Sequence, residues 1–312
     1  MSWDSDLAWR ERRKIWNEFV SEFSKLLDFG SHIQTGPSNP RLLPSDESSE
    51  HKSETKVLMF SPHPDDEALV GGFPLRLRLE LGASITNCAV TLGSNKAERE
   101  RRREEVEASC GVLGFNLLLP SDRDGLDEVT PDARHDSPNV WSRKVESIAE
   151  ILRGECPDML FFPHAKDFNS THLGTHLLIM DALKNWPEIA ARRFVVLVET
   201  EYWHQLSEPN LLVGLGNDTV ARLVMAVAEH GGEVARNSYH VRLPARLIDN
   251  VRRGAEVVGE QGASSPNFTF AELYRVSVLL TTGALERPSR GLVIGPEQDI
   301  QLTELAKYFS PR

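Results

Sequence analysis

Cysteine is scarce in this chain, with only Cys88, Cys110 and Cys156 among 312 residues. Their number is odd and no two of them stand in a Cys-x-x-Cys spacing, so the sequence indicates neither a disulfide framework nor a thiolate zinc site. Proteins without disulfides are typical of reducing compartments. We therefore expect a cytoplasmic protein whose chemistry does not depend on thiolate ligands.

The sequence also lacks an excess of positive charge and any long apolar run. Its formal net charge is -11, and binding to phosphate backbones requires a concentrated basic surface, so we expect no nucleic-acid partner. No stretch approaches the roughly 18 apolar residues of a membrane span. The acidic start at residues 1–6 has no apolar signal core. The sequence therefore predicts neither a membrane span nor export.

Short β-like runs alternate with longer helical stretches beyond residue 55. The expected strands are at 56–60, 84–91, 115–119, 158–162 and 194–199, with a further β-like run at 291–295. The expected helices are at 68–81, 97–113, 139–153, 171–186, 217–230 and 244–261. This alternation is typical of parallel βαβ units with helices on both faces of the sheet. We predict an α/β protein with a Rossmann-like three-layer α/β/α sandwich and a mostly parallel sheet.

The chain before this region has a different character. Residues 3–28 combine apolar and charged residues at close to helical period, which predicts an amphipathic N-terminal helix. We expect it to pack on the flank of the domain, with a lid or a contact between two copies as the alternatives. Residues 30–56 are rich in Ser, Pro, Gly and charge and predict a tether. We therefore divide the chain into residues 1–55, helix and linker, and one domain over 56–312.

The motif Ser61-Pro-His-Pro-Asp-Asp-Glu67 follows the first expected strand and opens a helical stretch. Ligands of open α/β sheets bind beyond the carboxyl ends of the strands, where this turn presents a histidine and carboxylates. Imidazole and carboxylate groups are common ligands of catalytic zinc. An Asp at a helix start can equally serve as a cap. No Gly-x-Gly-x-x-Gly occurs at this turn, so we do not expect a dinucleotide cofactor.

A second polar motif follows the expected strand at 158–162. It runs from Pro163 to His176 and contains His164, Asp167, Asn169 and His172 as well. The carboxyl ends of parallel strands lie at one edge of the sheet, so two such loops can contribute ligands to one metal site. An isolated histidine is most often a packed or surface residue. The prediction therefore depends on both motifs following strands.

Together the motifs Pro-His-Pro-Asp-Asp-Glu and Asp-x-Asn-x-x-His resemble those of the PIG-L/LmbE-like zinc-dependent de-N-acetylases, over roughly residues 56–260. The resemblance implies His63, Asp66 and His172 as metal ligands and Asp65 as general base. Three protein ligands leave a fourth position on zinc for a water of lowered pKa, and Asp65 could take its proton. Zinc is the implied metal, with iron or cobalt as alternatives.

The second motif departs from that family at one position. Many members have His-Pro-Asp-His there, and the first histidine lies near the reacting carbonyl, whereas this chain has Asn169, with Thr171 in place of the Asp. An amide can donate a hydrogen bond to an oxyanion but cannot carry a proton. Proton delivery must then come from Asp65, from water or from another histidine, and His240 is our first candidate.

Other residues of the second motif are candidates for supporting positions. His176 lies one helical turn after His172, where it could be a further ligand or a packing residue. His164 could orient Asp167 or His172 from outside the ligand set, or be an ordinary loop residue, and Asp167 is a candidate for the same supporting layer.

The substrate-binding candidates come from other places in the chain. Glu201 and Trp203, with the neighbouring His204, follow the fifth expected strand, and the family lines its pocket with a similar Glu-x-Trp segment. The resemblance implies an arginine near the substrate, most simply Arg102. Asp124 resembles an acidic loop residue that binds sugar hydroxyls, although Asp-Gly is also a turn signal.

These features predict a zinc-dependent hydrolase that removes an N-acetyl group from an N-acetylglucosamine-like sugar or glycoconjugate. An amidase of thiol conjugates or of another non-acetyl amide is the alternative within the same chemistry, because loops select the remainder of the substrate. A non-catalytic sugar-binding protein on the same fold is the alternative of another class. The sequence also allows a homo-oligomer.

Overall fold

Alternating strands and helices run through the residues that this computed structural model describes, which are 5–36, 53–121, 124–184, 186, 194–259 and 262–310. The strands are β1 (Lys56–Ser61), β2 (Ser84–Ala89), β3 (Asn116–Leu118), β4 (Met159–Pro163), β5 (Phe194–Thr200), β6 (Leu211–Leu215), β7 (Phe270–Leu280), β8 (Leu285–Glu286) and β9 (Leu292–Ile294). The helices are α1 (Ser5–Ser31), α2 (Asp66–Leu69), α3 (Gly72–Leu81), α4 (Arg99–Leu113), α5 (Pro131–Asp136), α6 (Pro138–Glu155), α7 (Ser170–Lys184), α8 (Asn217–Ala228), α9 (Gly231–Arg236), α10 (Tyr239–Gly259) and α11 (Leu302–Phe309).

The strands form one sheet in the order β3-β2-β1-β4-β5-β7-β6-β9, with β8 paired to β7. Strands β3, β2, β1, β4 and β5 are parallel, whereas β7 runs antiparallel to both β5 and β6. The prediction of a mostly parallel sheet is therefore confirmed. The chain moves from β1 to one side through β2 and β3 and then to the other side through β4. The switch point between β1 and β4 is where α/β sheets bind ligands.

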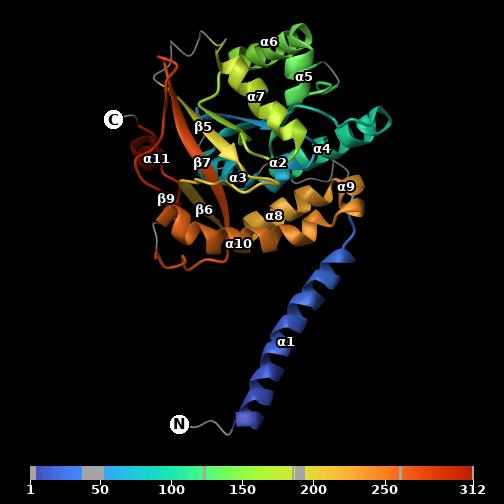
Figure 1. Cartoon of the computed structure of the whole chain (residues 1–312), viewed down its shortest axis with the longest axis vertical. Helices are drawn as coiled ribbons and strands as arrows, with labels where there is room; N and C mark the ends of the chain where they lie inside the picture. The colour runs from blue at the N-terminus through green and yellow to red at the C-terminus, as the bar shows by residue number, and fades with distance from the viewer. Residues whose placement is uncertain are drawn as a thin grey trace.

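Alternate residues of the strands point to opposite faces of the sheet and belong to two separate hydrophobic clusters. The predicted α/β/α sandwich of three layers is therefore confirmed. Val57 and Met59 of β1 pack with α3, α4, α8 and α10 on one face, and Leu58 and Phe60 pack with α6 and α7 on the other. Figure 1 shows α5, α6 and α7 above the sheet and α8 and α10 below it. Because both faces are covered, β1, β4 and β5 consist largely of apolar residues, and this pattern made them visible in the sequence.

Strands β6 and β7 are the main error of the sequence prediction, which placed two helices and one β-like run, at 291–295, beyond residue 210. For β7 the reason lies in its charged residues. Glu272 accepts hydrogen bonds from the backbone N–H groups of Gly72 and Phe73, and Arg275 forms two hydrogen bonds with Glu199 on β5. Buried charges interrupt the apolar pattern of a strand, and their partners lie far away in the sequence.

The N-terminal helix exists as predicted but does not pack on the flank of the domain. Helix α1 projects away from the α/β body (Figure 1), and its last turn contacts α10, with Gly30 against the Val241 side chain. The predicted tether falls largely on residues 37–52, outside the described residues, and the division at residue 55 stays a prediction. Within the described ranges, none of the helices is both long enough and apolar enough to cross a membrane.

Candidate metal centre

The turn after β1 is held in place by the end of β2. The Ser61 carbonyl accepts from the Val90 N–H at 2.8 Å, and the Pro62 carbonyl accepts from the Thr91 hydroxyl at 2.7 Å. Beyond this anchor, the backbone N–H of His63 donates to Oδ2 of Asp66 at 2.9 Å. The chain therefore folds back on itself over four residues, so that the imidazole of His63 and the carboxylate of Asp66 face the same point.

His172 reaches that point from the neighbouring strand end. It lies in the first turns of α7, after β4, and its Nε2 atom is 3.3 Å from Nδ1 of His63 and 3.3 Å from Oδ2 of Asp66. The third edge of this triangle, from His63 Nδ1 to Asp66 Oδ2, measures 3.4 Å. Two strand ends at the switch point of the sheet thus bring two nitrogens and one oxygen together.

The size of this triangle fits a tetrahedral metal ion. In a tetrahedron the edge is about 1.6 times the bond, so zinc bonds of roughly 2.0–2.1 Å correspond to edges of about 3.3–3.4 Å. Two histidine nitrogens and one carboxylate oxygen are a donor set that divalent transition ions accept. His63, Asp66 and His172 can therefore hold a divalent ion.

Asp167 supports His172 from the opposite side of the ring. Its Oδ1 atom lies 3.6 Å from Nδ1 of His172, which has no closer hydrogen-bond partner among the described residues. Asp167 also accepts from the backbone N–H groups of Asn169 at 2.9 Å and of Trp203 at 3.2 Å. A carboxylate on the outer nitrogen of a histidine is the usual support of a metal ligand.

The electrostatic field of the site favours a cation. Burial by itself would raise the pKa of the Asp66 carboxyl, but His172 and His63 outweigh it and hold that pKa below the usual range. Burial opposes the charging of His172, yet Asp66 and Asp167 raise the pKa of its imidazole to about 9. Two buried carboxylates thus stabilise positive charge on the ring between them, and a divalent ion would satisfy the same field.

Asp65 lies beside the metal-ligand group but is not part of it. Its backbone is left-handed, with φ of 112°, a conformation that costs a non-glycine residue of order 1–3 kcal/mol. The side chain is buried, and desolvation, followed by the charges of Asp66, Glu67 and Glu233, raises the pKa of Asp65 well above its usual range. A buried carboxyl with a raised pKa is a stronger proton acceptor once ionised.

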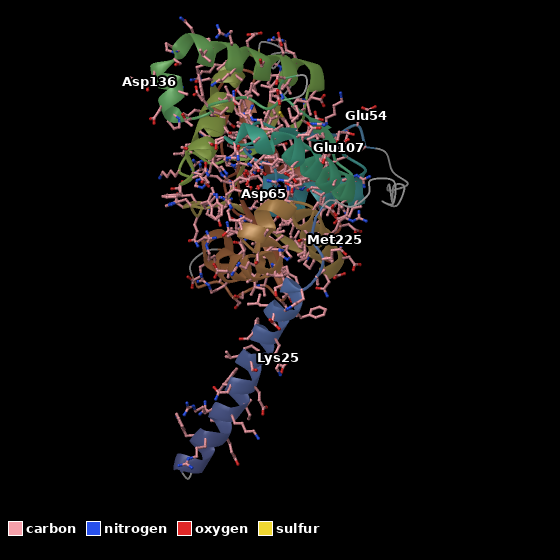
Figure 2. The ribbon with its side chains drawn as sticks, turned by 90° about the vertical axis from the view of Figure 1, so that its right-hand side faces the viewer. Lys25, Glu54, Asp65, Glu107, Asp136 and Met225 are labelled. Atoms are coloured by element: carbon pink, nitrogen blue, oxygen red, sulfur yellow. The ribbon has the colours of Figure 1, made fainter. Side chains whose placement is uncertain are left out.

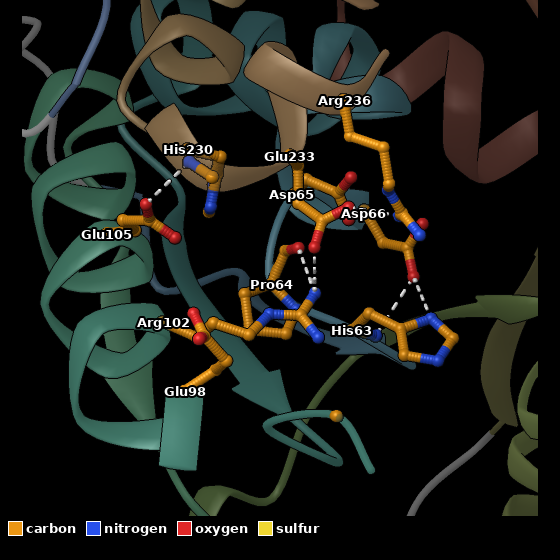
Figure 3. Close-up of polar contacts among 12 residues, drawn as sticks. His63, Pro64, Asp65, Asp66, Glu98, Arg102, Glu105, His230, Glu233 and Arg236 are labelled. Carbon is orange, nitrogen blue, oxygen red and sulfur yellow. Dashed lines mark hydrogen bonds and ion pairs between the residues drawn. The ribbon is translucent and has the colours of Figure 1, made fainter. Parts of the chain in front are cut away.

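Two charged residues from other elements meet at this turn. The Arg102 guanidinium on α4 donates to the Pro64 carbonyl at 3.3 Å and lies 3.3 Å from the Glu233 carboxylate on α9. Figure 3 shows the Arg102 side chain reaching the turn from one side, with dashed lines to Pro64 and Glu233 and with Asp65 close by. Arg102 thus lies next to the site, where its contacts hold the turn, and its role in binding substrate stays a prediction. Glu233 was not anticipated, because α9 was not recognised as a separate short helix.

Glu67, the last residue of the first motif, is fully buried and ties three elements together. Its carboxylate accepts from the Ser109 hydroxyl of α4 at 2.5 Å, from Nε2 of His230 at 2.7 Å and from the Asp65 N–H at 3.1 Å. The last bond supports the left-handed backbone of Asp65. Sequence reasoning missed Ser109 and His230, because neither residue lies in a recognisable motif.

Aromatic residues border the site on the side of β5 and α10. The ring of Tyr202 stands edge-on to His172 at 4.6 Å, and Trp203, which is 54% exposed, forms a similar contact with Tyr239 at 5.7 Å. Burial, followed by the negative charge of Asp65, raises the pKa of Tyr239, so its hydroxyl remains a donor. The sequence identified Trp203, whereas Tyr202 and Tyr239 were missed.

The residues that follow β4 have separate structural roles. Asn169 precedes α7, and its Oδ1 atom accepts from the Thr171 N–H at 2.8 Å, as in a helix cap. His164 is buried, accepts from the Lys166 N–H at its Nδ1 and contacts the His204 carbonyl through Nε2 at 2.9 Å. His176 lies one turn beyond His172, where its Nδ1 atom contacts the Pro163 carbonyl at 2.9 Å. His176 is therefore not one of the three converging ligands.

Three further candidates lie in other surroundings. Glu201 is buried just after β5 and forms two hydrogen bonds with Arg253 of α10, at 2.7 and 2.9 Å, so it connects the end of β5 to α10, and its role in binding substrate stays a prediction. His240 is buried at the start of α10, and neither of its ring nitrogens has a hydrogen-bond partner among the described residues. Asp124 is exposed in the loop after β3.

Residues 58–183 match the family model for PIG-L, which is described as GlcNAc-PI de-N-acetylase. The matched segment includes both motifs and all three converging ligands. No curated protein matches this chain.

Several solved structures resemble about 70% of this chain. The conserved protein TT1542 from Thermus thermophilus is 20% identical, with 70% of this chain and 92% of that chain covered and a TM-score of 0.50. GalB, a 4-carboxy-2-hydroxymuconate hydratase from Pseudomonas putida, is 18% identical, with 71% and 95% covered and a TM-score of 0.51. The zinc-inhibited form of teicoplanin deacetylase Orf2 is 17% identical, with 72% and 98% covered and a TM-score of 0.51. At sequence identities of 17–20%, the similarity to these structures shows a shared fold and no more than that.

Proposed function

Because residues 58–183 match the PIG-L family, we propose that this protein is a metal-dependent amide hydrolase that removes an acetyl group from an N-acetylglucosamine-like sugar or glycoconjugate. The observation that carries the proposal is the triangle of His63 Nδ1, Asp66 Oδ2 and His172 Nε2, with edges of 3.3–3.4 Å, and the separate buried carboxylate of Asp65 beside it. A divalent ion held there would polarise the amide carbonyl and lower the pKa of water at the site. Zinc is our first choice, with iron or cobalt as alternatives.

Asp65 is the proposed general base. Its carboxylate accepts one proton from the water that attacks the amide carbon and returns it to the nitrogen as the carbon–nitrogen bond breaks. The products are acetate and the free amine of the sugar. The raised pKa of Asp65 supports this role, because proton transfer is most effective when the carboxyl holds the proton long enough to deliver it.

Asn169 and Trp203 are the proposed contacts to the substrate. The Oδ1 atom of Asn169 is occupied by the Thr171 N–H, which leaves the amide Nδ2 group as a donor to the developing oxyanion. The exposed ring of Trp203 offers an apolar face for a sugar ring. We propose that Asp124 contacts sugar hydroxyls and that Arg102 holds the turn of Asp65 rather than the substrate. His240 stays a candidate proton donor. We also propose that the protein acts in the cytoplasm.

The test combines metal analysis with acetate release. Wild type and Asp65→Ala would be purified, their metal content measured, and acetate release followed on N-acetylglucosamine, its glycosides, longer N-acyl homologues and a thiol-conjugate amide. We expect equal metal content and turnover only in wild type, with acetyl substrates preferred. Asp136→Ala is the matched control, because Asp136 is an exposed carboxylate on α5, far from Asp65 (Figure 2).

Three outcomes contradict parts of this proposal. Loss of metal from Asp65→Ala would show that Asp65 is a ligand rather than the base. Faster hydrolysis of the longer N-acyl homologues or of the thiol-conjugate amide would show that the protein is an amidase of another kind and not a deacetylase. Tight binding of amino sugars by metal-loaded protein without any turnover would show a non-catalytic sugar-binding protein.

A further inference from the structure

Helix α1 carries an apolar face that nothing in the described chain covers. Trp9, Ile15, Trp16, Phe19, Phe23 and Leu26 are each at least half exposed. The aromatic contacts among them lie within the helix itself, between Trp16 and Phe19 at 5.7 Å and between Phe19 and Phe23 at 5.1 Å. Figure 2 shows α1 projecting from the body, with the side chains drawn along most of its length standing free of other elements. Contiguous apolar surface of this kind marks an interaction site.

The spacing of these residues suits another helix as the partner. Trp9, Trp16 and Phe23 are separated by seven residues, and Phe19 and Leu26 by seven as well, so two neighbouring rows share one face of the helix. Ile15, Val20 and Leu27 widen that face. An apolar arc of this width is typical of helices buried in a bundle. The helix has 27 residues and is therefore about 40 Å long.

Charge is divided along α1. Residues 10–14 contain four basic residues and one acidic residue, whereas residues 18–28 contain three acidic residues and one basic residue. In an antiparallel pair of identical helices, the basic half of each lies beside the acidic half of the other. A parallel pair would place like charges together. Complementary charge selects orientation in helix pairs.

We propose that α1 is a self-association helix that pairs antiparallel with α1 of a second copy of this chain. The apolar area that such a pair could bury is sufficient. Each helix exposes about half of four aromatic side chains of ~200 Å² each, so the aromatic residues of two helices offer ~800 Å². The aliphatic side chains bring the buried area to ~1,200 Å², the lower limit of specific interfaces. The proposal concerns a surface outside the metal centre and does not depend on the proposed reaction.

A lipid surface is a weaker partner for this helix. Helices that bind anionic membranes carry Lys and Arg on the polar face. Residues 5–31 hold five basic and five acidic residues, and the chain as a whole has a net charge of -11. Anionic lipids would repel the acidic half of α1 and the body to which it is attached. The segregated charges match a second copy better than they match a membrane.

The first test measures the mass of the full chain in solution by light scattering after size exclusion. We expect wild type at twice the chain mass of 35.0 kDa. The double variant Trp16→Glu with Phe23→Glu should have the mass of one chain. Asn17→Glu with Ser21→Glu is the matched control, because it adds the same charge on the polar face and should keep the double mass. Thermal unfolding of the α/β body should be the same in all three proteins.

The second test addresses the orientation. Reversing the basic half with Arg12→Glu and Arg13→Glu should weaken association at least about tenfold, which corresponds to ~1.4 kcal/mol. Adding Glu18→Lys and Glu22→Lys to the same chain should restore it, because the halves are then complementary again. In a parallel pair the first reversal would not weaken association.

Several results would overturn the proposal. A wild-type mass of 35.0 kDa at about 100 μM would exclude a specific pair, and binding of that single chain to vesicles of phosphatidylcholine and phosphatidylglycerol would make lipid the partner. An unchanged double mass in the Trp16→Glu, Phe23→Glu variant would place the interface elsewhere. Unchanged affinity after reversal of the basic half would refute the antiparallel arrangement.

Discussion

The carboxylate of Asp167 and the imidazole of His172 form a directed pair. Oδ1 of Asp167 is 3.6 Å from Nδ1 of the ring, whereas the Nε2 atom on the other side of the ring faces Asp66 and His63. Both side chains are buried. A proton held on Nδ1 therefore points at Asp167 and leaves the lone pair of Nε2 for a metal ion, which fixes the tautomer that a ligand needs.

Substitution of Asp167 should weaken metal binding while leaving the ligand set complete. In Asp167→Asn the charge beside His172 is lost, and we expect metal affinity to fall about 10- to 100-fold. Competition with a fluorescent chelator measures this change. Asp132→Asn, an exposed carboxylate on α5, is the control. Equal affinities of the two variants would show that Asp167 serves only the loop backbone.

The two histidines of α7 provide a matched pair for the ligand assignment. His172→Gln should lower metal affinity by more than about 100-fold, a larger loss than that of a residue outside the ligand set. His176→Gln should keep its metal, because His176 contacts the Pro163 carbonyl and not the converging group. Metal content after dialysis against a weak chelator distinguishes them. If the two variants lose metal equally, the assignment to His172 is wrong.

Asn169 should have two separable roles. Asn169→Ala removes both the acceptor for the Thr171 N–H and the amide donor, so we expect a loss of about 0.5–2 kcal/mol in the free energy of unfolding. Asn169→Ser keeps an acceptor at the helix start and should be nearly as stable as wild type. If the amide stabilises the oxyanion, kcat should fall about 10²- to 10³-fold in both variants.

The comparison of these two variants is decisive for Asn169. Urea unfolding gives the stability, and initial rates of acetate release give kcat and KM separately. If Asn169→Ser has the kcat of wild type, the Asn169 amide takes no part in the reaction, and the residue has only its structural role.

Glu67 should contribute to stability through its three buried hydrogen bonds. In Glu67→Gln one of the donors, from Ser109, His230 or Asp65, must face an amide NH₂ instead of an oxygen. We expect a loss of about 1–3 kcal/mol in the free energy of unfolding. The urea midpoint at unchanged slope measures it. Glu104→Gln, exposed on α4, is the control and should show almost no change.

Much of the fold could be predicted from the sequence where the signal is local. Strands β1, β4 and β5 are largely apolar runs, because both of their faces are buried. Helices α4, α6 and α8 begin and end within two residues of the predicted positions. Strand β7 was missed because it carries Glu272 and Arg275, whose compensating partners, the Gly72 and Phe73 N–H groups and Glu199, come from distant positions.

The candidate site divides in the same way. The motif around His63 is one turn of chain, and His172 follows another recognisable strand, so residue types and spacing identify both. Glu233 and His230 reach the site on segments without any motif. The hydrogen bonds of Glu201 to Arg253 were not anticipated, because Arg253 lies 52 residues away.

The sequence by itself determined the parallel α/β core and the identity of the candidate ligands, because apolar runs and a four-residue turn are properties of neighbouring residues. Only the tertiary structure decided that the three ligand atoms converge within 3.3–3.4 Å and that Asp167 faces the outer nitrogen of His172. It also decided that none of the described elements covers the apolar face of α1. Each of these depends on the distance between elements that the chain brings together only when it folds.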